Sequence, residues 1–140
     1  MEKKNVMSEE LAMGEINRWA DENEIDIYVK GQNGEKLLDA SIPKLVSKIQ
    51  SGASVVNENG CFEYTISDKS PAGYAGEKIV FKTPDGGAFM AMDKFKEHEG
   101  IHKTLAVASA MTGQDIRWFA NVAHNDYKVI SIITSFFIAG

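Results

Sequence analysis

The sequence predicts an α+β fold, with a small antiparallel β-hairpin sheet followed by a C-terminal helical subdomain of three to four short helices. Two patterns predict it. Residues 54–66 form two short apolar runs on either side of an Asn-Gly turn, as in a β-hairpin. Residues 102–138 instead carry apolar side chains at spacings of three and four, which is the period of a helix. No internal repeat is present, so the order of these elements defines the fold class.

The N-terminal part combines one helix pattern with one strand pattern. Residues 8–23 are amphipathic behind a serine cap, and an acidic run at residues 21–26 is typical of a solvated surface. Residues 25–29 alternate like a short strand. We therefore divide the chain into an N-terminal extension, residues 1–40, whose attachment the sequence leaves open, and a single domain, residues 41–140. The apolar face of the first helix is predicted to hold Leu11, Ala12, Ile16, Trp19 and Ala20.

The middle of the chain supplies a second helix and the sheet. Residues 41–50 have helical spacing, with Pro43 tolerable in the first turn and Gly52 at the end. Residues 78–82 are a further strand, followed by a turn rich in proline and glycine. For residues 88–92 we favour a helix over the return strand of a second hairpin.

Three helical segments are predicted to complete the fold. They cover residues 102–111, 115–123 and 126–138, and the third begins behind a cap at Asn125 or Asp126.

The last of these helices is apolar most of the way round. Ile132 and Ile138 lie off its main apolar face, so little of its surface is polar. A helix of this kind is buried, either in its own core or against a partner, and the sequence leaves that choice open. The main face holds Val129, Ile130, Ile133, Phe136 and Phe137.

Composition excludes several classes of function. The 140-residue chain has a net charge of −5, which argues against nucleic acid as a partner because phosphate binding requires a basic face. The terminal helix is too short to span a bilayer, so no membrane partner is expected. Residues 1–5 lack the apolar stretch of a signal peptide, and the single cysteine, Cys61, is expected to pack rather than react. We expect a cytoplasmic protein.

One motif has the form of a catalytic site. His98-Glu99-Gly100-Ile101-His102 matches the H-E-x-x-H pattern, in which two histidines one helical turn apart bind zinc and the glutamate acts as general base. Gly100 disfavours a helix there, and charged neighbours favour solvent exposure rather than a cleft. We therefore predict no catalytic residue, no metal site and no cofactor, with a small zinc-dependent hydrolase as the alternative. The downstream candidates for a third ligand are His124, Asp115 and Asp126.

Several short segments between residues 41 and 137 resemble one family. A strand at residues 62–66 leads to a proline, a strand at residues 79–82 leads to Thr83-Pro84, and Ala-Met-Thr-Gly precedes a short helix at Asp115. Asp126-Tyr127 then opens an apolar helix. In this order of parts the chain resembles the tail assembly chaperones of tailed bacteriophages.

The resemblance implies a non-catalytic chaperone made in the host cytoplasm. Such a protein coats the phage tape measure protein during tail assembly, works with other tail assembly proteins and forms homo-oligomers. A structural subunit of a tail or capsid is a further alternative. We expect the partner to be bound through apolar side chains shared between core and surface, namely Trp118, Phe119, Ile133, Phe136 and Phe137.

Overall fold

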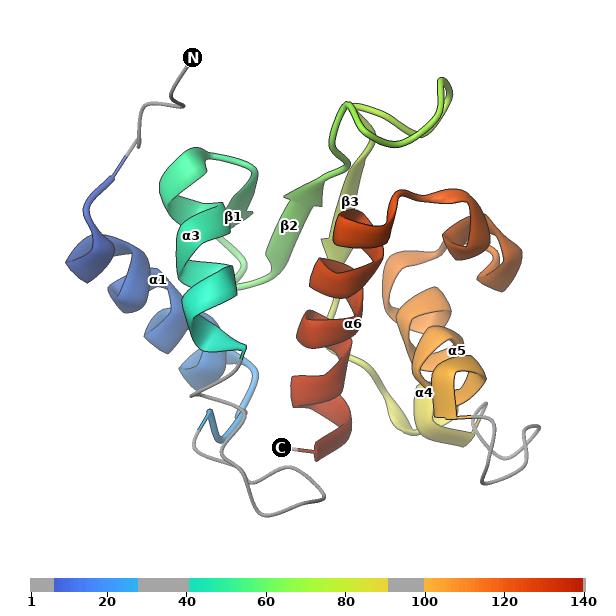
Figure 1. Cartoon of the computed structure of the whole chain (residues 1–140). Coiled ribbons are helices and arrows are strands. Elements are labelled where there is room, and N and C mark those ends of the chain that lie inside the picture. Colours follow the sequence, from blue (N-terminus) through green and yellow to red (C-terminus); the bar gives the residue numbers. More distant parts are fainter. Residues whose placement is uncertain (1–6, 28–40, 91–99, 140) are drawn as a thin grey trace.

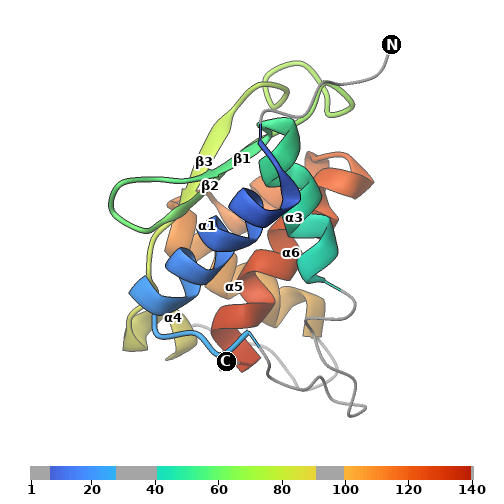
Figure 2. The ribbon, with the colours of Figure 1, turned by 90° about the vertical axis from the view of Figure 1, so that its left-hand side faces the viewer.

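The computed structural model describes residues 7–27, 41–90 and 100–139, and confirms the α+β fold. A three-stranded antiparallel sheet forms one layer, and helices cover one of its faces (Figures 1 and 2). The helices are α1 (Glu9–Glu22), α3 (Ile42–Ser51), α4 (Gly86–Met90), α5 (Gly100–Thr112), the 3-10 helix η2 (Ile116–Asn121) and α6 (His124–Ala139). No helix in the described ranges is long and apolar enough to cross a bilayer.

The sheet runs in the order β1 (Ser54–Val56), β2 (Phe62–Thr65), β3 (Lys78–Phe81). Phe62 pairs with Val56 on one side and with Phe81 on the other, so the register aligns large apolar residues across all three strands. Alternation along each strand turns these side chains to the helical face, while Val55 on the opposite face is exposed.

Two helix ends follow the local signals in the sequence. The Ser8 hydroxyl accepts a hydrogen bond from the Leu11 amide at 3.2 Å and caps α1. Gly52 ends α3 in the left-handed conformation, with φ of 84°. The helix preferred for residues 88–92 is confirmed where α4 covers them, up to Met90.

Helix α1 belongs to the same core as the sheet and α6. The Trp19 side chain is fully buried, and its ring meets those of Phe62, Phe136 and Phe137 edge-on at centroid distances of 5.3, 5.9 and 5.7 Å. The attachment of the N-terminal part, which the sequence left open, is thus a packed one for α1. Leu11, predicted on the apolar face, is instead 64% exposed.

The strand predicted for residues 25–29 is wrong over its described part. Ile25 to Ile27 form no strand, because the Ile25 amide donates to the Ala20 carbonyl at 2.8 Å and folds the chain back onto the end of α1. Ile27 is buried there. The rest of that prediction lies outside the described residues.

The C-terminal helices differ from prediction in two details. The segment predicted at residues 115–123 is a 3-10 helix, capped by Asp115. Helix α6 begins at His124, before either predicted cap. Asp126 therefore lies inside the first turn of α6, which leaves its carboxylate to bond elsewhere.

Candidate protein-interaction surface

Four of the five predicted partner-binding residues lie in the core of the chain. Phe119, Ile133 and Phe136 are at most 1% exposed, and Phe137 is 9% exposed. Helix α6 packs against α5, and its Phe136 and Phe137 meet Trp19 of α1, so its main apolar face is covered by this chain's own side chains, whereas Ile138 is 36% exposed. Partner binding through these four residues stays a prediction, and in the single chain they are not an accessible surface.

Trp118 is the member of the set that remains half-exposed. Its ring stacks at a tilt on Tyr74, with centroids 5.3 Å apart, and meets Phe119 edge-on at 5.3 Å. The Asn121 amide donates to the Tyr74 hydroxyl at 3.0 Å. These contacts fasten η2 to the connection between β2 and β3, so Trp118 has a packing role already.

The structure describes only part of the H-E-x-x-H motif. His98 and Glu99 lie outside the described residues, while His102 is exposed in the first turn of α5. Among the residues that the structure describes, no three histidine, cysteine or acidic side chains gather as a metal site would require. The candidate third ligands have other surroundings: His124 is exposed, and Asp115 caps η2 by accepting from the Arg117 amide at 2.8 Å.

The carboxylate of Asp126 accepts four hydrogen bonds from this chain. One carboxylate oxygen accepts from the Tyr64 hydroxyl at 2.5 Å and the Ser67 amide at 3.0 Å. The other accepts from the hydroxyls of Ser67 at 2.8 Å and Ser70 at 2.6 Å. Ser70 in turn accepts from the Ala123 amide at 2.7 Å. This cluster, the Asp126 clamp, locks the start of α6 to the β2–β3 connection.

The clamp keeps its carboxylate charged. Burial acts to raise the pKa of Asp126, but hydrogen bonds from Ser70, Tyr64 and Ser67 outweigh it and hold the pKa below its ordinary value. Burial and the neighbouring carboxylate raise the pKa of Tyr64. All four acceptor positions of the carboxylate are taken up by the chain itself, which favours a structural role over metal binding.

An accessible hollow with apolar side chains in its lining lies instead between α1 and α3. A groove of about 380 Å³ separates these helices, which lie side by side in Figure 2. Across Met13 it meets a shallower hollow along α1, lined by Glu9, Glu10, Gly14 and Asn17. We call the two together the α1–α3 groove. The groove between the helices is lined by Glu9, Met13, Ile42, Pro43, Val46 and Gln50.

Sequence reasoning missed this groove. Met13 is adjacent to the buried stripe of α1, and Ile42 and Val46 are themselves core residues whose edges line the groove. The only signal was an apolar residue beside, rather than on, the buried face of α1. Whether Met13 lies in a groove depends on the angle at which α1 crosses α3. The sequence pattern of either helix does not determine that angle.

Comparison with known proteins adds no relative. No protein family, curated protein or solved structure matches this chain.

Proposed function

We propose that the chain is a non-catalytic phage tail assembly chaperone that binds and solubilises the tape measure protein, and that the α1–α3 groove holds a helix of that client. The observation that carries the proposal is an accessible groove with an apolar floor between two helices of a well-packed domain. Grooves of this form take amphipathic helices through side chains spaced three and four apart.

Gly14 adds a specific reason to place a client backbone on α1. It lies in the middle of the helix, where glycine costs roughly 1 kcal/mol relative to alanine. A Cβ built there meets no atom of this chain within 4 Å, so internal packing does not require glycine. The missing side chain leaves room for a second helix to approach closely.

The acidic rim of the groove favours a client helix of positive charge. Glu9 and Glu10 line it, and the carboxylates of both are exposed in the first turn of α1. A helix with an apolar stripe flanked by lysine or arginine complements this arrangement, because opposite charges at the rim speed association and fix orientation.

The decisive test pairs stability with binding. Gly14→Ala is expected to raise the free energy of unfolding by roughly 1 kcal/mol, yet to reduce the amount of tape measure protein kept in solution on co-expression. Met13→Glu is expected to abolish solubilisation of the tape measure protein, since it places a charge on the groove floor. Ser47→Ala serves as the control, because Ser47 is exposed on α3 and does not line the groove. Wild-type solubilisation by both Gly14→Ala and Met13→Glu would contradict the proposal.

Composition of finished particles separates the chaperone from a structural subunit. A chaperone leaves before the tail is complete, so mass spectrometry of purified particles should not find the chain. Its presence in amounts comparable to other tail subunits would contradict the proposal.

A further inference from the structure

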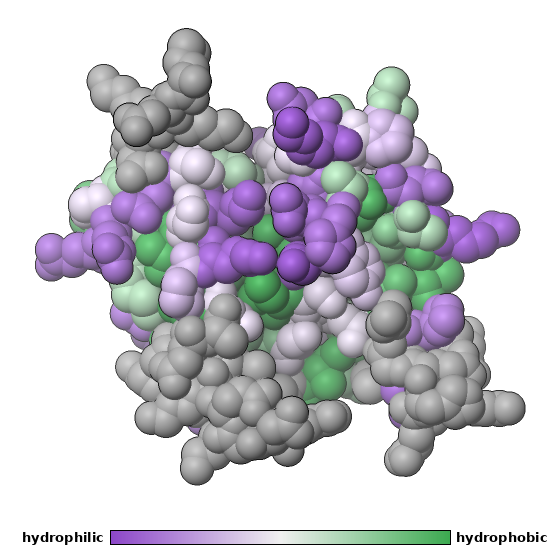
Figure 3. Space-filling view, in the orientation of Figure 1, coloured by the Kyte–Doolittle hydropathy of each residue, from purple (hydrophilic) through white to green (hydrophobic). Residues whose placement is uncertain are grey.

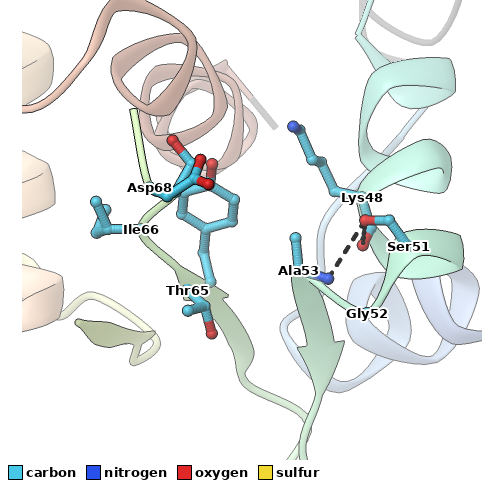
Figure 4. Close-up of a pocket in the computed structure, with 9 residues that line it drawn as sticks. Lys48, Ser51, Gly52, Ala53, Thr65, Ile66 and Asp68 are labelled. Atoms are coloured by element: carbon cyan, nitrogen blue, oxygen red, sulfur yellow. Dashed lines mark hydrogen bonds between the residues drawn. The ribbon is translucent and has the colours of Figure 1, made fainter. Parts of the chain in front are cut away.

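The face of the molecule that carries α3 and α6 has a polar surface with balanced charges. Hydrophilic side chains lie along both helices in Figure 3. Lys48 and Asp68 face each other across a hollow of about 430 Å³ between α3 and β2 (Figure 4), so their charges offset each other. The hydroxyl groups of Ser51, Tyr64 and Ser67, which also line this hollow, already donate within the chain. A chemically reactive pair of residues lies elsewhere, in the turn between β1 and β2.

This pair is Asn59-Gly60, in which Asn59 is exposed and Gly60 is buried. An asparagine followed by glycine is prone to deamidation, because glycine has no side chain to hinder attack by its amide nitrogen. The Gly60 nitrogen bonds to the Asn59 side-chain carbonyl carbon, and the side-chain NH₂ leaves with the Gly60 proton as ammonia. Water then opens the resulting succinimide at either carbonyl. The products are aspartate and isoaspartate, and isoaspartate carries an extra methylene in the main chain.

The conformation of the turn opposes the first step of this reaction. The Gly60 amide donates to the Asn57 carbonyl at 3.0 Å, and Gly60 has a φ of 78°. The Asn57 side-chain oxygen accepts from the amides of Asn59 and Cys61, each at 3.0 Å. Attack requires the Gly60 nitrogen to lose its hydrogen bond and its proton and to turn toward the Asn59 side chain. The hydrogen-bonded turn therefore holds the nucleophile away from its target.

Helix α1 holds the turn in this conformation. The Arg18 guanidinium donates to the carbonyls of Val56 at 2.7 Å and Asn57 at 2.9 Å. Near the end of the helix, the Asn23 amide donates to the Gly60 carbonyl at 2.9 Å. Figure 2 shows the end of α1 beside the turn. Three carbonyls of the hairpin are thus fixed by two side chains from one helix.

The deamidated product does not fit this contact. Gly60 approaches α1 so closely that a Cβ there would lie 2.7 Å from the Cβ of Glu22. Isoaspartate at position 59 lengthens the main chain by a methylene next to this contact. It also adds a carboxylate near the exposed acidic side chains of Asp21, Glu22 and Glu24, and like charges repel.

We propose that Asn59 is a deamidation site that bound α1 protects, and that its conversion to isoaspartate releases the end of α1 from the hairpin. The loss of ammonia makes the change one-way. Because α1 forms one wall of the α1–α3 groove, conversion loosens that wall as well. The tests below require no client, so their outcome is independent of the proposed function.

Peptide mass spectrometry of the full chain in mildly alkaline buffer measures the conversion of each asparagine. We expect Asn59 to convert at least about tenfold more slowly in the folded chain than in the same chain in denaturant. Asn33-Gly34 is the other Asn-Gly pair in the sequence and is the reference for the denatured chain, where both pairs should convert at similar rates.

Substitution of Arg18 tests the role of α1. Arg18→Ala removes two hydrogen bonds to the turn and should speed conversion of Asn59 by about tenfold. The matched control is Arg117→Ala, which removes an exposed arginine that pairs with Asp115 on η2. Trp118→Ala controls for a general loss of stability. Both controls should leave the rate at Asn59 unchanged.

Hydrogen exchange tests the release of α1. Chains with isoaspartate at position 59, separated by chromatography, should exchange the amide hydrogens of α1 faster than unconverted chains, with α6 unchanged. Asn59→Asp adds the charge without lengthening the main chain, so it should have a smaller effect.

Equal rates at Asn59 in the folded and denatured chains, or in Arg18→Ala and Arg117→Ala, would overturn the protective role of α1. Unchanged hydrogen exchange of α1 after conversion would overturn its release. If Arg18→Ala does not fold, Asn23→Ala takes its place. It removes the bond to the Gly60 carbonyl, with a smaller expected acceleration.

Discussion

Helices α1 and α6 are both rich in apolar residues, but they use them differently. On α6, Ile130, Ile133 and Phe136 are fully buried beneath other elements of the chain. Helix α1 buries one stripe and leaves Met13 and Gly14 beside it in a groove. A helix that is apolar nearly all round is therefore the centre of this fold, whereas a helix with a narrow stripe leaves room for a partner at its border.

The largest expected effect separates these two helices directly. Phe136→Ala removes a fully buried ring from the aromatic cluster and should lower the free energy of unfolding by about 3–5 kcal/mol. Met13→Ala, at the border of the groove, should cost well under half of that. Chemical denaturation of both variants measures the difference, and equal losses would remove the distinction drawn between α1 and α6.

Loss of the Asp126 clamp should rank next. Asp126→Asn substitutes two donors for one charged acceptor oxygen, so donors from Tyr64, Ser67 or Ser70 are left buried without a partner. We expect a loss of about 3 kcal/mol in the free energy of unfolding, with α6 retained in circular dichroism. A change within error of wild type would show that the clamp does not hold α6 to the sheet.

The clamp should also give the chain a characteristic response to acid. Because the folded pKa of Asp126 lies below its unfolded value of about 3.9, the stabilisation is complete above that value and is lost as pH falls toward the folded pKa. The difference in unfolding free energy between wild type and Asp126→Asn should therefore shrink below about pH 4. A difference that stays constant, or grows, in acid would refute this assignment.

The smallest effect distinguishes two neighbours on η2. Trp118→Ala removes a half-exposed ring stacked on Tyr74 and should cost about 1 kcal/mol. Phe119→Ala, in the core, should cost several times more. Thermal unfolding of the pair is sufficient, and a Trp118 variant as unstable as the Phe119 variant would place both side chains in the core.

Local patterns in the sequence predicted most of the elements. The hairpin and, to within one residue, the bounds of α3 follow from strand alternation, the Asn-Gly turn and Gly52, because these signals act over a few residues. The short strand at residues 25–29 failed where the end of α1 captured the Ile25 amide, a contact that alternation does not encode.

The interaction surface was harder to predict than the fold. Apolar side chains at helical spacing identify what is buried, but not whether this chain or a partner covers them, and Phe136 shows the former. Asp126 matched the pattern of a helix cap, yet its partners lie 56 to 62 residues earlier in the chain. The α1–α3 groove exists only because two helices cross, so neither helix predicts it alone.

The most direct test of the central claim is site-specific crosslinking from the groove. A photoreactive side chain replaces Asn17, which is exposed on the rim of the groove, or Ala110, which is exposed on α5, and each variant is co-expressed with the tape measure protein. We expect crosslinks to the client from position 17 and none from position 110. Crosslinks from position 110 without any from position 17 would contradict the α1–α3 groove as the client site.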